Sequence, residues 1–162
     1  MSKSSLSHPG ALKAIATAWL VAGTLDILGA FTHFYCKTGK NPVPVVLKYV
    51  ASGVFGPDAM KGGIDMMVWG LVFHFLIALG CVLAFFWLYP NIKLMRANKW
   101  LTAVVYGLLV WVVTTRLIVP LSHVKTAAFN LGSALTAMLI LICMIGVPVT
   151  LIIGNYYTKE KK

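Results

Sequence analysis

Three ionisable side chains, Asp26, His74 and Arg116, lie inside long apolar stretches of this chain. A charge at the centre of a hydrocarbon layer costs about 2.5–3.5 kcal/mol on insertion scales, so such groups usually face a bundle interior and pair there. Asp26 and Arg116 have opposite charges and can form an ion pair, and His74 can hydrogen-bond to that pair or titrate with it. These three residues are the predicted buried polar cluster.

The two apolar stretches that carry Asp26 and His74 also present small residues on the same helical face. Small residues let helices approach closely, so these faces are expected to pack against other helices. On the first helix the face comprises Ala22, Gly23, Asp26, Gly29, Ala30 and His33, and on the second it comprises Gly70, His74, Ala78 and Cys81.

The depth of each polar residue follows from helical rise. Asp26 and His74 each lie about ten residues, or about 15 Å, from the same end of their helices, and Arg116 lies about six residues in. Further polar residues lie nearer that end and form a predicted polar rim: His33, His123, Asn130 and Ser133. One half of the bundle is therefore expected to be polar and the other nearly apolar.

This arrangement has two interpretations. The cluster can be a polar cavity that opens at one end and carries protons or a solute. It can equally be a buried salt bridge that fixes helix register and binds nothing. The chain has no HExxH, GxSxG or phosphate-loop motif, so an enzyme is the less expected alternative.

No cofactor or metal is expected. Haem would need axial ligands such as two histidines at matched depth, but His33 and His74 differ in depth by about 10 Å. His33, His123 and Asp58 could approach a metal at the surface, but they lack a local ligand spacing. Cys36, Cys81 and Cys143 are far apart in sequence and are interpreted as small packing residues without disulfides.

Composition places the chain among membrane proteins. Its 162 residues are 59% hydrophobic and 11% charged, and the mean hydropathy is +0.85. These values exclude an ordinary soluble domain. The net charge of +10 comes from short basic runs at the ends of apolar segments. Anionic lipid headgroups, rather than nucleic acid, are the expected counter-charge.

The hydropathy pattern predicts an all-α integral membrane protein with one transmembrane domain of four helices, at about 12–36, 64–89, 101–121 and 127–157. Pro148 is expected to kink the last helix. Residues 43–55 have apolar side chains at helical spacing and predict a short helix that lies in the membrane interface after the first span.

The distribution of Lys and Arg predicts the orientation. The N-terminus, the loop after the second span and the C-terminal tail lie on one side and hold Lys3, Lys13, Lys93, Arg96, Lys99, Lys159, Lys161 and Lys162. The other side holds Lys37, Lys40, Lys48, Lys61 and Lys125. The positive-inside rule therefore places both termini in the cytoplasm.

Two segments, HFLIALGCVLAFFWLYPNIKL (74–94) and YGLLVWVVTTRLIVPLS (106–122), are similar to the small uncharacterised bacterial inner-membrane proteins typified by YagU. In that family a histidine opens an apolar helix, a short basic loop with proline follows, and the next helix ends in Pro-Leu. His74 and Pro120 match this pattern, whereas Arg116 departs from it. The resemblance implies a helical bundle in a bacterial inner membrane, with a role in acid or envelope stress.

Three functions remain open from the sequence. The first is a noncatalytic subunit or accessory protein of a larger membrane assembly, because the chain is small, lacks catalytic motifs and is expected to be held by a central ion pair. The second is a small proton, ion or solute channel or carrier that uses Asp26, His74 and Arg116. The third is a membrane enzyme that acts on a lipid or quinone. Expected partners are anionic lipids, other membrane subunits or further copies of the chain.

Overall fold

The computed structural model describes residues 10–124 and 130–159, and these residues contain helices but no strands. Four helices are long and apolar enough to cross a membrane: Ala11–Thr38, Ile64–Asn91, Lys99–Leu121 and Leu131–Thr158. The predicted helical bundle is confirmed. The predicted spans are correct to within two residues, apart from the start of the fourth, whose predicted first residues lie partly outside the described part.

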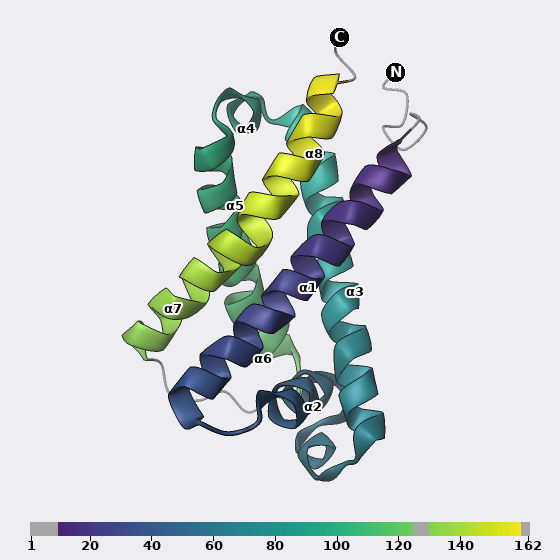
Figure 1. The fold of residues 1–162 in the computed structure, drawn as a ribbon, viewed down its shortest axis with the longest axis vertical. Helices are drawn as coiled ribbons and strands as arrows, with labels where there is room; N and C mark the ends of the chain where they lie inside the picture. The colour runs from purple at the N-terminus through teal and green to yellow at the C-terminus, as the bar shows by residue number, and fades with distance from the viewer. Residues whose placement is uncertain (1–9, 125–129, 160–162) are drawn as a thin grey trace.

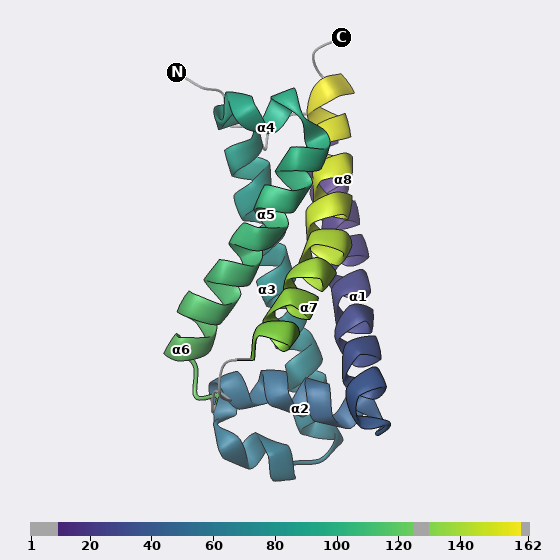
Figure 2. The same ribbon diagram turned by 90° about the vertical axis from the view of Figure 1, so that its left-hand side faces the viewer.

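The long helices run side by side along the length of the molecule (Figures 1 and 2). The first is α1 (Ala11–Thr38) and the second is α3 (Ile64–Asn91). The third consists of α5 (Lys99–Val113), η3 (Thr114–Ile118) and α6 (Val119–Leu121). The fourth consists of α7 (Leu131–Leu141), η4 (Ile142–Gly146) and α8 (Val147–Lys159). Helix α1 begins and α8 ends at the same end of the bundle, which we call the terminal end.

The opposite end of the bundle is crossed by α2 (Pro42–Phe55), followed by the short 3-10 helix η2 (Pro57–Lys61) (Figure 2). We call it the α2 end. Asn41 caps α2 by accepting a hydrogen bond from the Val43 N–H at 3.1 Å, and Pro42 occupies the first turn, where a missing N–H has no cost. Gly56, with φ +75°, allows the chain to turn out of α2. Residues 43–55 are therefore helical, as predicted.

Helix α2 contacts α3 at backbone distance. A Cβ atom on Gly70 would lie 1.9 Å from the Leu47 carbonyl oxygen. Only glycine fits at this position. Gly70 was predicted to lie on a face that packs against another helix, and that helix is α2. The His123 N–H also donates to the Gly53 carbonyl at 3.0 Å, which joins α2 to the chain after α6.

Two π-helical turns interrupt the third and fourth long helices, and each ends two residues before a proline. The turn η3 precedes Pro120, and the turn η4 precedes Pro148. A proline cannot donate to the carbonyl four residues earlier and its ring clashes with that carbonyl; a π-turn is one way in which a helix adapts. The expected disturbance near Pro148 is therefore a π-turn that precedes it. By contrast, α3 continues through Pro90 to Asn91 rather than ending at Tyr89.

The tightest packing lies in the terminal half, where α1, α3, α5 and α8 meet. The largest side chains without solvent exposure are all there: Val82, Phe85, Val149, Thr150 and Ile153. A small helix that the sequence did not predict, α4 (Lys93–Ala97), joins α3 to α5 at this end. It is held by the Thr102 hydroxyl, which donates to the Met95 carbonyl at 2.9 Å.

Candidate functional site

The candidate site is centred on His74, which lies between α1 and α3. Its Nε2 is 2.8 Å from the carbonyl oxygen of Gly23 on α1. Because a carbonyl oxygen only accepts hydrogen bonds, Nε2 must carry the proton, which fixes the tautomer of the neutral ring. The equal depth predicted for Asp26 and His74 is compatible with this contact, because Gly23 lies one helical turn from Asp26.

Asp26 lies one helical turn after Gly23, on the same face of α1. Its half-buried carboxylate interacts electrostatically with His74 and with Cys81 of α3. Within the described part of the chain it forms no hydrogen bond and no ion pair. The structure thus brings together two members of the predicted cluster and leaves the carboxylate without a fixed cation.

Arg116 does not join them, and the expected Asp26–Arg116 ion pair is absent from the described residues. The side chain of Arg116 is exposed, and the ion pair that those residues do contain joins Lys61 to Asp58 at 2.8 Å on the surface. The physical reason lies in η3, which contains Arg116. A π-turn changes the number of residues per turn, so the direction of a side chain around the axis no longer follows α-helical spacing.

Arg116 instead lines a cavity of about 780 Å³ at the α2 end, together with Asn130 and Ser133 of the predicted rim. Tyr49 of α2 and Trp111 of α5 also line it. Asn130 caps α7 by accepting from the Ser133 N–H at 2.9 Å, and the Ser133 hydroxyl accepts from Lys37 of α1. The residues that line this cavity include one cation, Arg116, and no carboxylate, and Lys37 reaches its edge through Ser133.

The two rim histidines lie apart from this cavity. His33 lines a second cavity, of about 480 Å³, between α1 and α7, with Cys36 and Thr136. His123 is exposed after α6. In the described part of the chain no three His, Cys, Asp or Glu residues gather in a way that could hold a metal ion. The cysteines at 36, 81 and 143 are free.

The sequence reasoning missed the contact that fixes α1 against α3 next to the site. The Trp19 indole N–H donates to the carbonyl of Phe75 at 2.7 Å, and the two rings meet edge to face with centroids 6.0 Å apart. Phe75 also meets the His74 ring edge to face at 5.4 Å. A tryptophan near one helix end and a polar residue mid-helix are only weak signals of such a contact, because either could face lipid.

Comparison of the chain with models of protein families, with curated proteins and with solved structures found no match.

Proposed function

We propose that the chain is a small carrier or channel of a bacterial inner membrane that moves protons, or a solute together with protons. The observation that carries this proposal is the Asp26–His74 pair, in the middle of two apolar helices, without a fixed cation in the described residues. An ionisable group at that depth is costly and is a functional candidate by default. A carboxylate beside an imidazole can exchange one proton between them instead of holding a permanent charge.

Access to the pair is proposed to come from the α2 end. The cavity lined by Arg116, Asn130 and Ser133 would admit water and small anions there. The terminal half is closed by large buried side chains, among them Phe85, Val149 and Ile153. The structure would then represent a state open on one side, and transport would require the terminal half to open.

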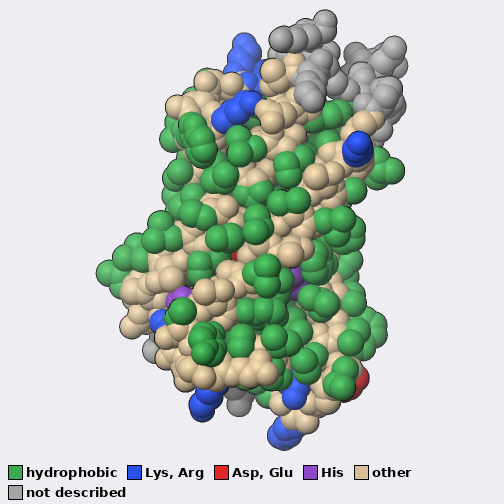
Figure 3. Space-filling view, in the orientation of Figure 1, with side chains coloured by type: hydrophobic (Ala, Val, Ile, Leu, Met, Phe, Trp, Pro, Cys, Tyr) green, Lys and Arg blue, Asp and Glu red, His purple; other side chains and the backbone are tan. Residues whose placement is uncertain are grey.

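The proposed orientation places the four long helices across the bilayer, α2 in the outer interface and both termini in the cytoplasm. On the visible face, Lys and Arg gather at the two ends and apolar side chains cover the middle (Figure 3). Trp87 and Trp100, each 67% exposed, lie near the terminal end, as residues of an aromatic belt would. The similarity of residues 74–94 and 106–122 to the YagU-type proteins supports a location in a bacterial inner membrane.

Proton uptake by purified protein in liposomes tests the function. Vesicles that contain a pH-sensitive dye are given an inward proton gradient, and the rate of internal acidification is measured. Asp26→Asn should abolish uptake, because the amide cannot carry the proton. His74→Gln should slow it. Asp58→Asn is the matched control, since Asp58 pairs with Lys61 on the surface. Equal uptake by the wild type and Asp26→Asn would refute the proposal.

Cysteine labelling in intact cells tests the orientation. A cysteine at Asp58 should react with an impermeant reagent, whereas one at Lys99 should react only after the membrane is permeabilised. The reverse pattern would place the α2 end in the cytoplasm. Spin labels through α2 should show lipid exposure with a helical period if the helix lies in the interface, and uniform exposure to water would contradict that position.

A second candidate is a noncatalytic subunit or accessory protein of a larger membrane assembly. The closed, apolar terminal half favours this second candidate. Among the largest fully buried side chains there, Thr150 is the one polar group, so protons have little to follow through this half. Under this hypothesis the isolated protein would give no uptake, and mild-detergent purification from native membranes would recover partner subunits at fixed stoichiometry. Recovery of the chain alone, without uptake, would count against both candidates.

A further inference from the structure

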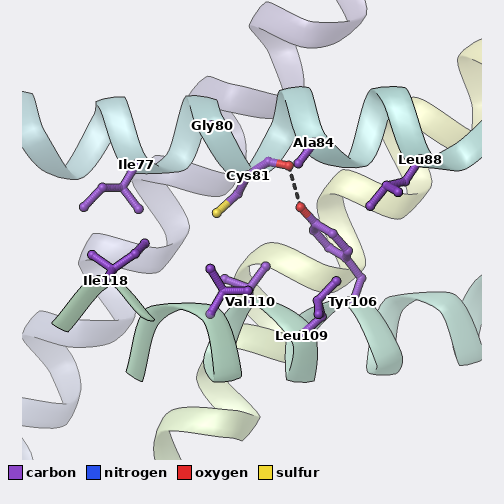
Figure 4. A pocket seen from close by; sticks show the side chains of 10 residues that line it. Ile77, Gly80, Cys81, Ala84, Leu88, Tyr106, Leu109, Val110 and Ile118 are labelled. Atoms are coloured by element: carbon purple, nitrogen blue, oxygen red, sulfur yellow. Dashed lines mark hydrogen bonds between the residues drawn. The ribbon is translucent and has the colours of Figure 1, made fainter. Parts of the chain in front are cut away.

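An apolar cleft runs between α3 and α5, and its wall includes Cys81, which also interacts with Asp26. Two connected hollows of about 270 and 180 Å³ form it, and both are lined by Leu88, Tyr106 and Leu109. The first hollow extends to Ile77 and Ile118, and the second to Ile92 and Leu94 at the terminal end. Figure 4 shows side chains from the two helices facing each other across the first hollow. The cleft is therefore lined almost entirely by hydrocarbon and reaches the terminal end of the bundle.

The one large polar side chain in the cleft has its polar atom satisfied. The Tyr106 hydroxyl donates to the Cys81 carbonyl across the gap, so its ring contributes an apolar wall (Figure 4). A water molecule needs two to four polar partners, which these walls do not supply. The cleft is therefore suited to an apolar chain rather than to water or a polar solute.

Two exposed cations lie on α4, at the terminal end of the cleft. Ile92, which precedes α4, and Leu94 and Met95 of α4 line the cleft. The same helix carries Lys93 and Arg96, three residues apart and both exposed. Within the described residues, neither cation forms a hydrogen bond or an ion pair. The sequence contains no Asp or Glu from residue 66 to residue 159. The described residues therefore offer Lys93 and Arg96 no carboxylate partner.

We infer that this cleft binds one anionic glycerophospholipid, with an acyl chain between α3 and α5 and the phosphate against Lys93 and Arg96. The chain would bury its hydrocarbon against Leu88 and Leu109, and the headgroup would lie where the basic corner α3–α4–α5 reaches the membrane surface. Basic corners between membrane helices bind anionic headgroups in this way. This inference does not depend on the proposed transport function.

Lipid titration of the full chain in detergent, followed by native mass spectrometry, tests the headgroup. Phosphatidylglycerol should bind at one copy per chain and more tightly than phosphatidylcholine with the same chains. The double variant Lys93→Gln and Arg96→Gln should weaken phosphatidylglycerol binding about 30-fold, which corresponds to about 1 kcal/mol for each cation. Lys13→Gln with Lys40→Gln removes the same charge elsewhere and should leave the affinity unchanged.

Filling the cleft tests the acyl chain separately. A Cβ atom on Gly80 would meet nothing within 4 Å, so Gly80→Leu fills the first hollow without a backbone clash. Leu109→Trp fills the space shared by both hollows. Each should abolish binding of phosphatidylglycerol at one copy per chain. The control is Leu139→Trp, because Leu139 is 62% exposed on α7 and lies outside the cleft. Helix content and melting temperature are recorded for every variant.

The inference would be overturned by equal binding of the two lipids, or by undiminished binding in the Gly80→Leu protein. A lipid-free dimer that is broken by Gly80→Leu would also overturn it, since the cleft would then hold a second copy of the chain. If Leu109→Trp lowers the melting temperature, the Gly80→Leu variant decides the outcome, because its added side chain enters open space.

Discussion

The two ends of the bundle are built differently. In the terminal half, α1, α3, α5 and α8 enclose Phe85, Val149 and Ile153 without solvent exposure, and aromatic rings such as Tyr89 and Tyr157 stack beside them. In the α2 half, cavities of about 780 and 480 Å³ separate the helices, and Arg116 is exposed. Stability is therefore concentrated in one half, while the half that holds the candidate access route is loosely packed. Regions that move or bind are commonly drawn from the less stable part of a protein.

The largest expected effect is in the terminal half. Phe85→Ala removes a fully buried ring and leaves a cavity among α3, α5 and α8. We expect the free energy of unfolding to fall by about 3 kcal/mol. This is the lower limit for such a change in the core of a soluble protein, and we choose it because lipid tails also solvate apolar groups. Thermal melting in detergent measures this. Leu139→Ala, at a 62% exposed position, should change little, and equal losses would erase the contrast.

A matched pair of glycines on α3 tests the attachment of α2. In Gly70→Ala the new Cβ would lie 1.9 Å from the Leu47 carbonyl oxygen, so α2 must move away. We expect a loss of about 1–3 kcal/mol, as for other overpacked contacts. In Gly80→Ala the Cβ meets nothing within 4 Å, and stability should stay the same or rise by about 0.4–1 kcal/mol. Chemical unfolding and protease cleavage near α2 measure both variants.

Charge removal at Asp26 and Arg116 should have smaller and independent effects. A buried ion pair would lose about 3–5 kcal/mol when one partner is removed. Because the two residues are not paired, we expect Asp26→Asn and Arg116→Met each to change stability by less than that, and the double variant to equal their sum. Melting of all four proteins tests this. A double variant that is more stable than either single variant would instead show that Asp26 and Arg116 form an ion pair, contrary to the structure.

The smallest expected effect concerns pH. Burial raises the pKa of Tyr49 on α2 above its usual 10.0. The neutral phenol is thus favoured in the folded protein, so this stabilisation is complete below pH 10 and is lost as the pH rises through the higher folded-state pKa. Melting at pH 8 and at about pH 11 should show an alkaline loss that Tyr49→Phe reduces. An identical loss in the Tyr49→Phe protein would assign it to other groups.

Hydropathy and helical spacing predicted the long helices and α2 well, because both depend on residue order along one helix. The helix predicted at 43–55 begins one residue earlier, at Pro42, where a proline is well tolerated. The equal depth predicted for Asp26 and His74 rests on helical rise alone. The position of Arg116 around its helix did not follow. It depends on η3, and a proline two residues after a helical turn is compatible with a π-turn, a kink or an end.

The placement of α4, the Trp19 contact and the α3–α5 cleft could not be predicted either. Each depends on how far neighbouring helices stand apart, which is decided by side chains that pack across the whole bundle. Sequence spacing gives the face of one helix, but it does not choose between lipid and another helix as the neighbour of that face.

The packing of α2 on Gly70 of α3 has a consequence for biosynthesis. Both helices belong to the first 91 residues, so their contact can form before the remainder of the chain has left the ribosome. The terminal half must wait for α8, which is translated last and supplies Val149 and Ile153. We expect the loose half to assemble first and the rigid half to close last, with the basic residues before α5 holding the unfinished bundle at the membrane surface.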